Sequence, residues 1–182
     1  MFERPDEELV ARWAAGDLSA FEALYDRYRQ PLYRYLLRLA GDEASANDWY
    51  QGAWEKVIRA RKSYKPKAPF RAWLYRIAHN HVIDVRRRER RMEHMDTDAV
   101  VKLPGKDPPM DIAQLLRDCV QRLLALLSGL PETQRSAFLL KEEAGLSLAQ
   151  IGEVTGVERE TVKSRLRYAL RRLRAGLEGC DE

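Results

Sequence analysis

The stretch SLAQIGEVTG, residues 147–156, decides how the C-terminal half of this 182-residue chain folds. Ser147 and Gln150 have the spacing of a capping box, in which two side chains satisfy free backbone amides at the start of a helix. Gly156 can adopt the left-handed backbone conformation that a sharp turn requires. The stretch therefore predicts a short capped helix followed by a tight turn. The inner face of this helix is formed by Leu148, Ile151 and Val154.

A longer helix is predicted to follow the turn, from Glu158 to Leu177. Two helices at this spacing are typical of a helix-turn-helix, whose second helix enters the major groove of DNA. Basic residues near the start of that helix would meet base edges, and later ones would meet phosphates. The alternative is a charge-rich helix that only faces solvent. The predicted apolar stripe is Val162, Leu166, Leu170 and Leu173, and the basic residues outside it are Arg159, Lys163, Arg167, Arg171 and Arg174.

Apolar residues recur at helical spacing through almost the whole chain, and no convincing alternating strand occurs. The pattern fails between Met95 and Asp111, where turn formers and charges replace the periodic apolar positions. We therefore predict an all-α protein of two small helical domains joined by a flexible linker. The predicted parts are a first domain over residues 1–94, a linker over 95–111 and a second domain over 112–182.

The composition favours a globular protein with a polyanionic partner. A hydrophobic share of 45% argues against a disordered chain, and a net charge of +4 with a pI near 9.1 leans toward nucleic acid. Cys119 and Cys180 lie in no metal-ligand spacing, and we interpret them as free thiols in a reducing cytosol. No apolar run of about 18 residues occurs, so a cytoplasmic location is expected.

The letters AHNHVID, residues 78–84, precede the arginine run RRRERR at 86–91 and raise the question of a metal-dependent nuclease. Both segments belong to one predicted helix that starts at Pro69, and helical spacing places His81 in its apolar stripe and His79 nearly opposite. Two imidazoles so placed cannot chelate one ion. We interpret His81 as a core histidine with Asp84 as its partner. No catalytic residue, metal site or cofactor is therefore expected.

The other face of this helix suits nucleic acid better than chemistry. It combines an aromatic, an amide and spaced arginines: Trp73, Arg76, Asn80, Arg87 and Arg91. The preceding loop over residues 61–67 is basic and contains Tyr64, so loop and helix together could stack and hold an unpaired base. A solvated amphipathic helix is the alternative reading of the same residues.

Five segments in this order resemble the extracytoplasmic-function sigma factors, the smallest class of the sigma-70 family of RNA polymerase subunits. They are FEALYDRY at 21–28, DWYQGAW at 48–54, FRAWLYRIAHN at 70–80, LPETQR at 130–135 and TVKSRL at 161–166. Each segment alone is weak, but the ordered set covers nearly the whole chain. The resemblance implies a subunit without catalysis of its own that binds core RNA polymerase and directs initiation at specific promoters.

The resemblance also implies a role for each surface. The first domain, region 2, would dock on the clamp helices of the beta-prime subunit through Asp48, Gln51 and Trp54. It would open the minus-10 element with Tyr64, Lys65, Lys67, Trp73, Arg76, Asn80, Arg87 and Arg91. The second domain, region 4, would touch the beta flap and bind the minus-35 duplex with Arg159, Thr161, Lys163, Ser164, Arg167 and Arg171. An anti-sigma factor that wedges between the two domains is a further expected partner and could hold the protein near the membrane.

Two positions depart from the pattern of the family. Gly52 replaces a commonly acidic residue in the expected docking helix and costs about 1 kcal/mol of helix propensity relative to alanine. Glu158 stands where a small residue or proline often begins the recognition helix, and it could accept a hydrogen bond from a cytosine amino group. The alternative function is a core-independent helix-turn-helix regulator, which would need a palindromic operator with half-sites about one helical turn apart.

Overall fold

The computed structural model describes residues 4–93 and 112–178, and within these ranges the chain forms helices and no strand. The predicted all-α class is confirmed, whereas the predicted linker at 95–111 lies outside the described residues. The elements are α1 (Asp6–Ala14), α2 (Leu18–Ala40), α3 (Glu43–Ala60), the short 3-10 helix η1 (Arg61–Ser63), α4 (Phe70–Glu93), α5 (Ile112–Ser128), α6 (Glu132–Glu142), α7 (Leu148–Thr155) and α8 (Arg159–Gly176).

Local side-chain chemistry sets the starts of the N-terminal helices. The Asp17 carboxylate accepts from the backbone amides of Ser19 and Ala20 at the start of α2, and the Asp42 carboxylate accepts from Ser45 at the start of α3. Hydrogen bonds from Ser19 and Arg12 lower the pKa of Asp17 to about 2. These caps satisfy amides that a helix start otherwise leaves free.

The helix-turn-helix forms as the sequence predicts. The Ser147 amide donates to the Gln150 side chain over 2.9 Å, and the Gln150 amide donates to the Ser147 hydroxyl over 3.3 Å. Gly156 ends α7 with a φ of 69°. Gly152 is required as well, because a Cβ there would lie 2.6 Å from the carbonyl oxygen of Val157. The turn between α7 and α8 is therefore fixed by one cap and two glycines.

The buried stripe of α8 differs from the prediction at one position. Val162, Leu166 and Leu173 are buried as expected, but Leu170 is 38% exposed and Ala169 takes the buried place instead. Leu170 lies at the edge of the stripe, where the small Ala169 brings α8 close to its neighbours.

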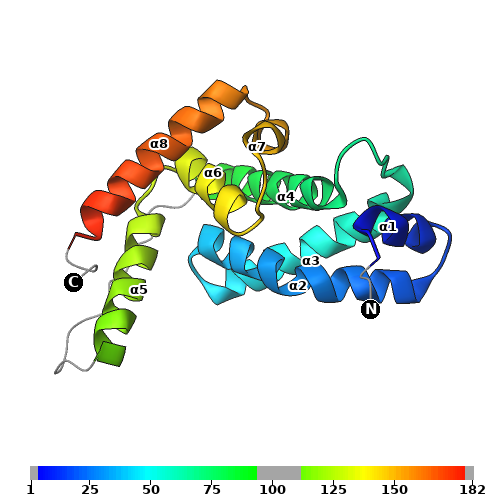
Figure 1. Cartoon of the computed structure of the whole chain (residues 1–182), viewed down its shortest axis with the longest axis horizontal. Coiled ribbons are helices and arrows are strands. Elements are labelled where there is room, and N and C mark those ends of the chain that lie inside the picture. The colour runs from blue at the N-terminus through cyan, green and yellow to red at the C-terminus, as the bar shows by residue number, and fades with distance from the viewer. Residues whose placement is uncertain (1–3, 94–111, 179–182) are drawn as a thin grey trace.

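The two halves of the chain share one core in this arrangement. Figure 1 shows α4 with α2 and α3 on one side and α7 on the other. A continuous cluster of buried side chains runs from Trp13 in α1 through Leu74 in α4 to Val154 in α7 and Val162 in α8. A smaller cluster joins α5 to α8. Helix α4 is therefore an internal element of the whole described structure.

His79 of α4 does not lie on the side that the sequence predicts for it. His79 is buried, with its Nδ1 atom 3.2 Å from the Tyr35 hydroxyl, whereas His81 is half-buried. The prediction that α4 has a single apolar stripe was wrong, because neighbouring helices cover α4 on two sides. The expected pairing of His81 with Asp84 is also wrong, since Asp84 binds Lys56 over 3.0 Å. Among the described residues, His81 Nδ1 has no hydrogen-bond partner.

The expectation of a free thiol at Cys119 is contradicted as well, because this residue of α5 is disulfide-bonded in the structure. Periodicity and ligand spacing say nothing about which thiols come together across a folded domain. Cys180, the only other cysteine of the sequence, lies outside the described residues.

The absence of a side chain at Gly52 makes room for the imidazole ring of His81. A Cβ added at Gly52 would overlap the far edge of the His81 ring, so glycine leaves the space in which this imidazole lies between α3 and α4. Glycine at position 52, where the family commonly has an acidic residue, therefore avoids a steric clash with His81.

We predict that Gly52→Ala destabilises the protein by about 1–3 kcal/mol through overpacking, partly offset by about 1 kcal/mol of helix propensity. In a His81→Ala background the same change should stabilise, because only the propensity gain remains. Urea unfolding of the two single variants and the double variant measures this change of sign. A Gly52→Ala effect that is identical in both backgrounds would contradict the proposed steric link.

A second prediction concerns His79 and acid. Burial lowers the pKa of His79 to about 4, with Glu132 raising it and Arg86 and Arg165 lowering it further. The unfolded chain takes up this proton near the ordinary value of 6.5, so the unfolded state binds more protons between pH 6.5 and 4. Stability is therefore fully present above this window and falls through it as the pH drops, by about 3 kcal/mol at most.

The measurement is thermal unfolding of the wild type and of His79→Asn, which keeps a hydrogen-bonding group near Tyr35 but does not titrate. The variant should lose less stability than the wild type from pH 7 to 4. Parallel pH profiles would show that His79 does not carry the effect.

Candidate nucleic-acid interface

The outer face of α4 presents the polar groups that the sequence assigns to an unpaired strand. Arg76 and Asn80 are exposed, and Asn80 borders an open hollow of about 450 Å³ between α3 and α4. Lys56 and Arg59 of α3 line the other side of this hollow. The sequence argument missed these two residues because they lie on a different helix. Cations and an amide thus converge where a backbone and a base could be held together.

The loop before α4 is held in one shape by aromatic packing. The Tyr64 ring lies edge-on to Trp73 at 5.3 Å and to Phe70 at 6.1 Å between centroids. Its hydroxyl donates to the Ala68 carbonyl over 2.8 Å, closing the loop onto itself. Lys65 and Lys67 remain exposed. The loop therefore presents two cations from a supported backbone next to the α4 face.

The C-terminal part of α4 carries a hollow of about 360 Å³, which we call the arginine hollow. Arg87 and Arg91 are its exposed members that the sequence assigns to DNA. Arg86 and Arg90 complete it and bind the Glu132 carboxylate of α6 over 2.8 and 2.9 Å. The full lining is Ile83, Arg86, Arg87, Arg90, Arg91 and Glu132. Sequence reasoning missed Arg86 and Arg90, since their partner lies about 40 residues away along the chain.

Helix α3 places only part of the expected polymerase-binding set on the surface. Asp48 and Gln51 are exposed one turn apart. Trp54 is buried at 6% exposure, with its ring 5.0 Å from that of Tyr25 and 6.0 Å from that of Phe21. The prediction of Trp54 as a surface anchor therefore does not fit this arrangement. The residue instead packs against α2, beneath the surface on which Asp48 and Gln51 lie.

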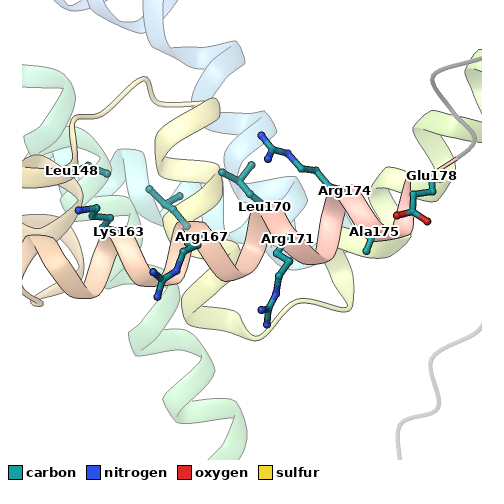
Figure 2. A pocket seen from close by; sticks show the side chains of 9 residues that line it. Leu148, Lys163, Arg167, Leu170, Arg171, Arg174, Ala175 and Glu178 are labelled. Carbon is teal, nitrogen blue, oxygen red and sulfur yellow. The ribbon is translucent and has the colours of Figure 1, made fainter.

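The basic residues of α8 line its solvent side. Arg159, Thr161, Lys163, Arg167 and Arg171 are exposed, and Ser164 is half-buried. Figure 2 shows Lys163, Arg167, Arg171 and Arg174 spaced along α8, with Leu170 between them. They border a groove of about 650 Å³ whose lining also includes Leu148 and Leu166. Arg167 and Arg171 lie over the Tyr168 ring at 5.5 and 5.2 Å, which aligns both guanidiniums along the helix.

A cleft of about 390 Å³ lies between α4 and the helix-turn-helix. Arg76, His79 and Asn80 of α4 form one wall. Glu153 and Thr155 of α7, Gly156 of the turn and Arg165 of α8 line the other side. The helix-turn-helix formed by α7 and α8 therefore lies directly beside the face of α4 that contains Asn80.

The letters of the nuclease motif do not converge on a metal. The His79 ring lies against Tyr35 of α2 and the His81 ring against Gly52 of α3, so the two imidazoles face different neighbours. Over residues 4–93 and 112–178, no group of three or more histidine, cysteine or acidic side chains is placed to hold an ion. Within the same ranges, no helix is long and apolar enough to cross a membrane.

Comparison with known proteins accounts for both halves of the chain. Residues 24–92 match the family model of Sigma-70 region 2, and residues 120–173 match that of Sigma-70, region 4. The ECF RNA polymerase sigma factor SigL of Mycobacterium tuberculosis is 36% identical over 93% of this chain and 95% of its own length. SigK of a Mycobacterium species (strain KMS) is 32% identical over 94% of this chain and 88% of its own length.

Solved structures agree on the fold. CnrH, in complex with the cytosolic domain of CnrY, superposes with a TM-score of 0.70 at 25% identity, over 95% of this chain and 97% of that one. The sigma factor RpoE, in complex with the anti-sigma factor NepR from Bartonella quintana, gives 0.71 at 22% identity, over 87% and 97%. With two matching regions in order and relatives similar over nearly their full length, the chain belongs to the extracytoplasmic-function sigma factors, the sigma-70 family subunits that direct RNA polymerase to specific promoters.

Proposed function

We propose that three surfaces of this sigma factor have separate roles. Helix α3 docks on core polymerase, α4 with its preceding loop opens the minus-10 element, and α8 binds the minus-35 duplex. The observation that supports it best is the presence of two separate exposed basic faces, on α4 and on α8. Two such faces, joined by a linker at 95–111, bind strongly only when a third body fixes their spacing. Core polymerase would be that body and would supply the nucleotidyl transfer, so the chain needs no catalysis of its own.

The proposed minus-10 site combines stacking with charge. Asn80 would read an unpaired base by hydrogen bonding, because its exposed amide offers both donors and an acceptor. Tyr64 and Trp73 provide the aromatic wall, and Lys65, Lys67 and Arg76 hold the strand by its phosphates. Arg87 and Arg91 would extend this grip along α4 by holding further phosphates of the strand.

The proposed minus-35 site follows the geometry of the helix-turn-helix. Arg159, Thr161, Lys163 and Ser164 lie in the first turns of α8, where a recognition helix meets base edges. Arg167 and Arg171 lie one and two turns further on and suit phosphates. Glu158 stands directly before α8 as its N-terminal cap residue, so its carboxylate would face the same groove.

The proposed polymerase contact rests on Asp48 and Gln51, which present a carboxylate and an amide beside each other on α3. Trp54 would act by holding α3 straight against α2. We place the protein in the cytoplasm, where core polymerase and promoter DNA are found. We also propose an anti-sigma factor as a partner, by analogy with the Bartonella quintana relative that was solved with one.

The function is tested by adding the purified chain to core polymerase free of other sigma factors, with fragmented genomic DNA of the source bacterium as template. Sequencing of transcript starts should reveal a recurring pair of elements upstream. Absence of any promoter-dependent transcript would contradict the proposal. Tight binding to a palindromic duplex without polymerase would instead favour an independent regulator.

Asn80→Ala should impair promoter opening while leaving core affinity unchanged, because only the exposed DNA face is altered. The loss of one base-reading contact corresponds to about 1–3 kcal/mol, or roughly 5- to 150-fold in open complex. Permanganate footprinting of unpaired thymines measures opening, and native gel titration measures core binding.

Asp48→Asn is the matched control, since it keeps the side-chain shape but should weaken core binding and leave opening by the saturated holoenzyme intact. If Asn80→Ala lowered core affinity, or if Asp48→Asn lowered opening at saturation, the two faces would be wrongly assigned.

A further inference from the structure

The Glu132 carboxylate fills an anion site on α4. Arg86 and Arg90 each donate to one of its oxygens, at 2.8 and 2.9 Å, inside the arginine hollow. Burial raises the pKa of this carboxyl, but hydrogen bonds and charge from Arg86 and Arg90 outweigh it and hold the pKa below its usual value. Glu132 is therefore ionised at neutral pH and serves as a carboxylate ligand from the other domain.

The site keeps its shape by contacts that do not involve Glu132. Arg86 also donates to the carbonyl of Leu39 over 2.6 Å, and its guanidinium lies 5.0 Å from the centre of the Trp49 ring. Its side chain is only 17% exposed. Arg90 is by contrast 70% exposed and one helical turn away. One guanidinium is thus fixed and the other can adjust to what the site holds.

The chemistry of the site suits a phosphate as well as a carboxylate. Two guanidiniums that each donate to one oxygen of a carboxylate can donate equally to two oxygens of a phosphodiester. The neighbouring Arg87 and Arg91 are exposed on the same hollow and add positive charge, and neither forms an ion pair with a carboxylate of residues 4–93 or 112–178. The hollow therefore carries four guanidiniums and a single carboxylate.

A second glutamate of region 4 makes a comparable contact elsewhere. Glu143, which follows α6, binds Arg34 over 3.0 Å and also Arg38, both on α2. Its side chain is 9% exposed. Glu143 joins the same two domains as Glu132 does, but its arginines lie on α2 and not in the arginine hollow. This pair provides the matched control for any effect of Glu132.

We propose that Glu132 is a built-in competitor of promoter DNA: Arg86 and Arg90 form a phosphate site that the Glu132 carboxylate occupies when region 4 packs on α4, and that a backbone phosphate takes over when region 4 moves away. The inference rests on the proposed function of α4 and extends it to two arginines outside the minus-10 set. Carboxylate and phosphate exclude each other because both need the same two guanidinium donors, one from Arg86 and one from Arg90. DNA binding and domain closure are coupled through this one site.

The experiment uses the full chain without polymerase and a fluorescein-labelled single strand of mixed sequence as the probe. Anisotropy titrations at several salt concentrations give the Kd and the slope of log Kd against log salt. Glu132→Gln should bind more tightly than the wild type and steepen the slope by about 0.7, the value for one added phosphate contact on single-stranded DNA. Glu132→Gln with Arg90→Ala should lose both gains.

Glu132→Gln with Arg38→Ala is the control, because it removes an arginine from the other interdomain pair and leaves the hollow intact. It should keep the tighter Kd and the steeper slope. Equal losses from Arg90→Ala and Arg38→Ala would overturn the phosphate site and leave only a general charge effect. An unchanged Kd and slope in Glu132→Gln would overturn the competition itself.

Thermal unfolding and circular dichroism of each variant separate these results from misfolding. The glutamine is nearly isosteric with glutamate, and Arg90 is largely exposed, so folded variants are expected. Failure of the proposed function can be told apart from failure of the Glu132 proposal, because it would appear as an absence of promoter-dependent transcription with core polymerase. The difference between Arg90→Ala and Arg38→Ala in DNA binding would still be measured.

Discussion

Helix α4 is packed on two sides, and this double coverage governs the rest of the structure. Its apolar positions complete the region 2 core with α2 and α3, while α7 packs on its opposite flank. Phe70, Leu74 and Tyr75 are fully buried as a result. A helix with both flanks occupied keeps only a narrow strip for solvent. That strip carries Arg76, Asn80 and Arg87, the residues proposed to meet DNA.

The contact between the domains combines apolar burial with charge, and the two contribute differently. Burying a leucine or valine side chain such as Leu146 or Val154 stabilises by about 1.5–3 kcal/mol. The interdomain ion pairs also bear the cost of desolvating their charges, since the side chains of Glu143 and Arg86 are only 9% and 17% exposed. The apolar contacts therefore supply most of the stability of the closed form. The pairs at Glu132 and Glu143 select its register, because each glutamate fits between two arginines of region 2.

Features that depend on neighbours in the chain could be predicted from the sequence. The capping box at Ser147, the left-handed Gly156 and the basic side of α8 all follow from spacing within about 20 residues. The helical class follows from the same local periodicity.

Features that depend on contacts between distant segments could not be predicted. His79 is buried, contrary to the prediction, because region 4 covers a flank of α4 that a single apolar stripe leaves free. The ion pair of Arg86 with Glu132 and the space that Gly52 leaves for His81 likewise depend on segments far apart in the chain. Trp54 looked like a surface anchor because helical spacing does not reveal the rings of Phe21 and Tyr25 around it.

The closed loop before α4 has an entropic consequence. Tyr64 ties the loop to the Ala68 carbonyl and packs against two rings, so the backbone that presents Lys65 and Lys67 is already ordered before any strand arrives. A flexible segment would lose about 1–2 kcal/mol of conformational entropy per residue on being fixed by its ligand. Here that ordering takes place during folding. If the lysines contact a nucleic-acid backbone as proposed, the free energy of those contacts would favour melting of the duplex instead of ordering the loop.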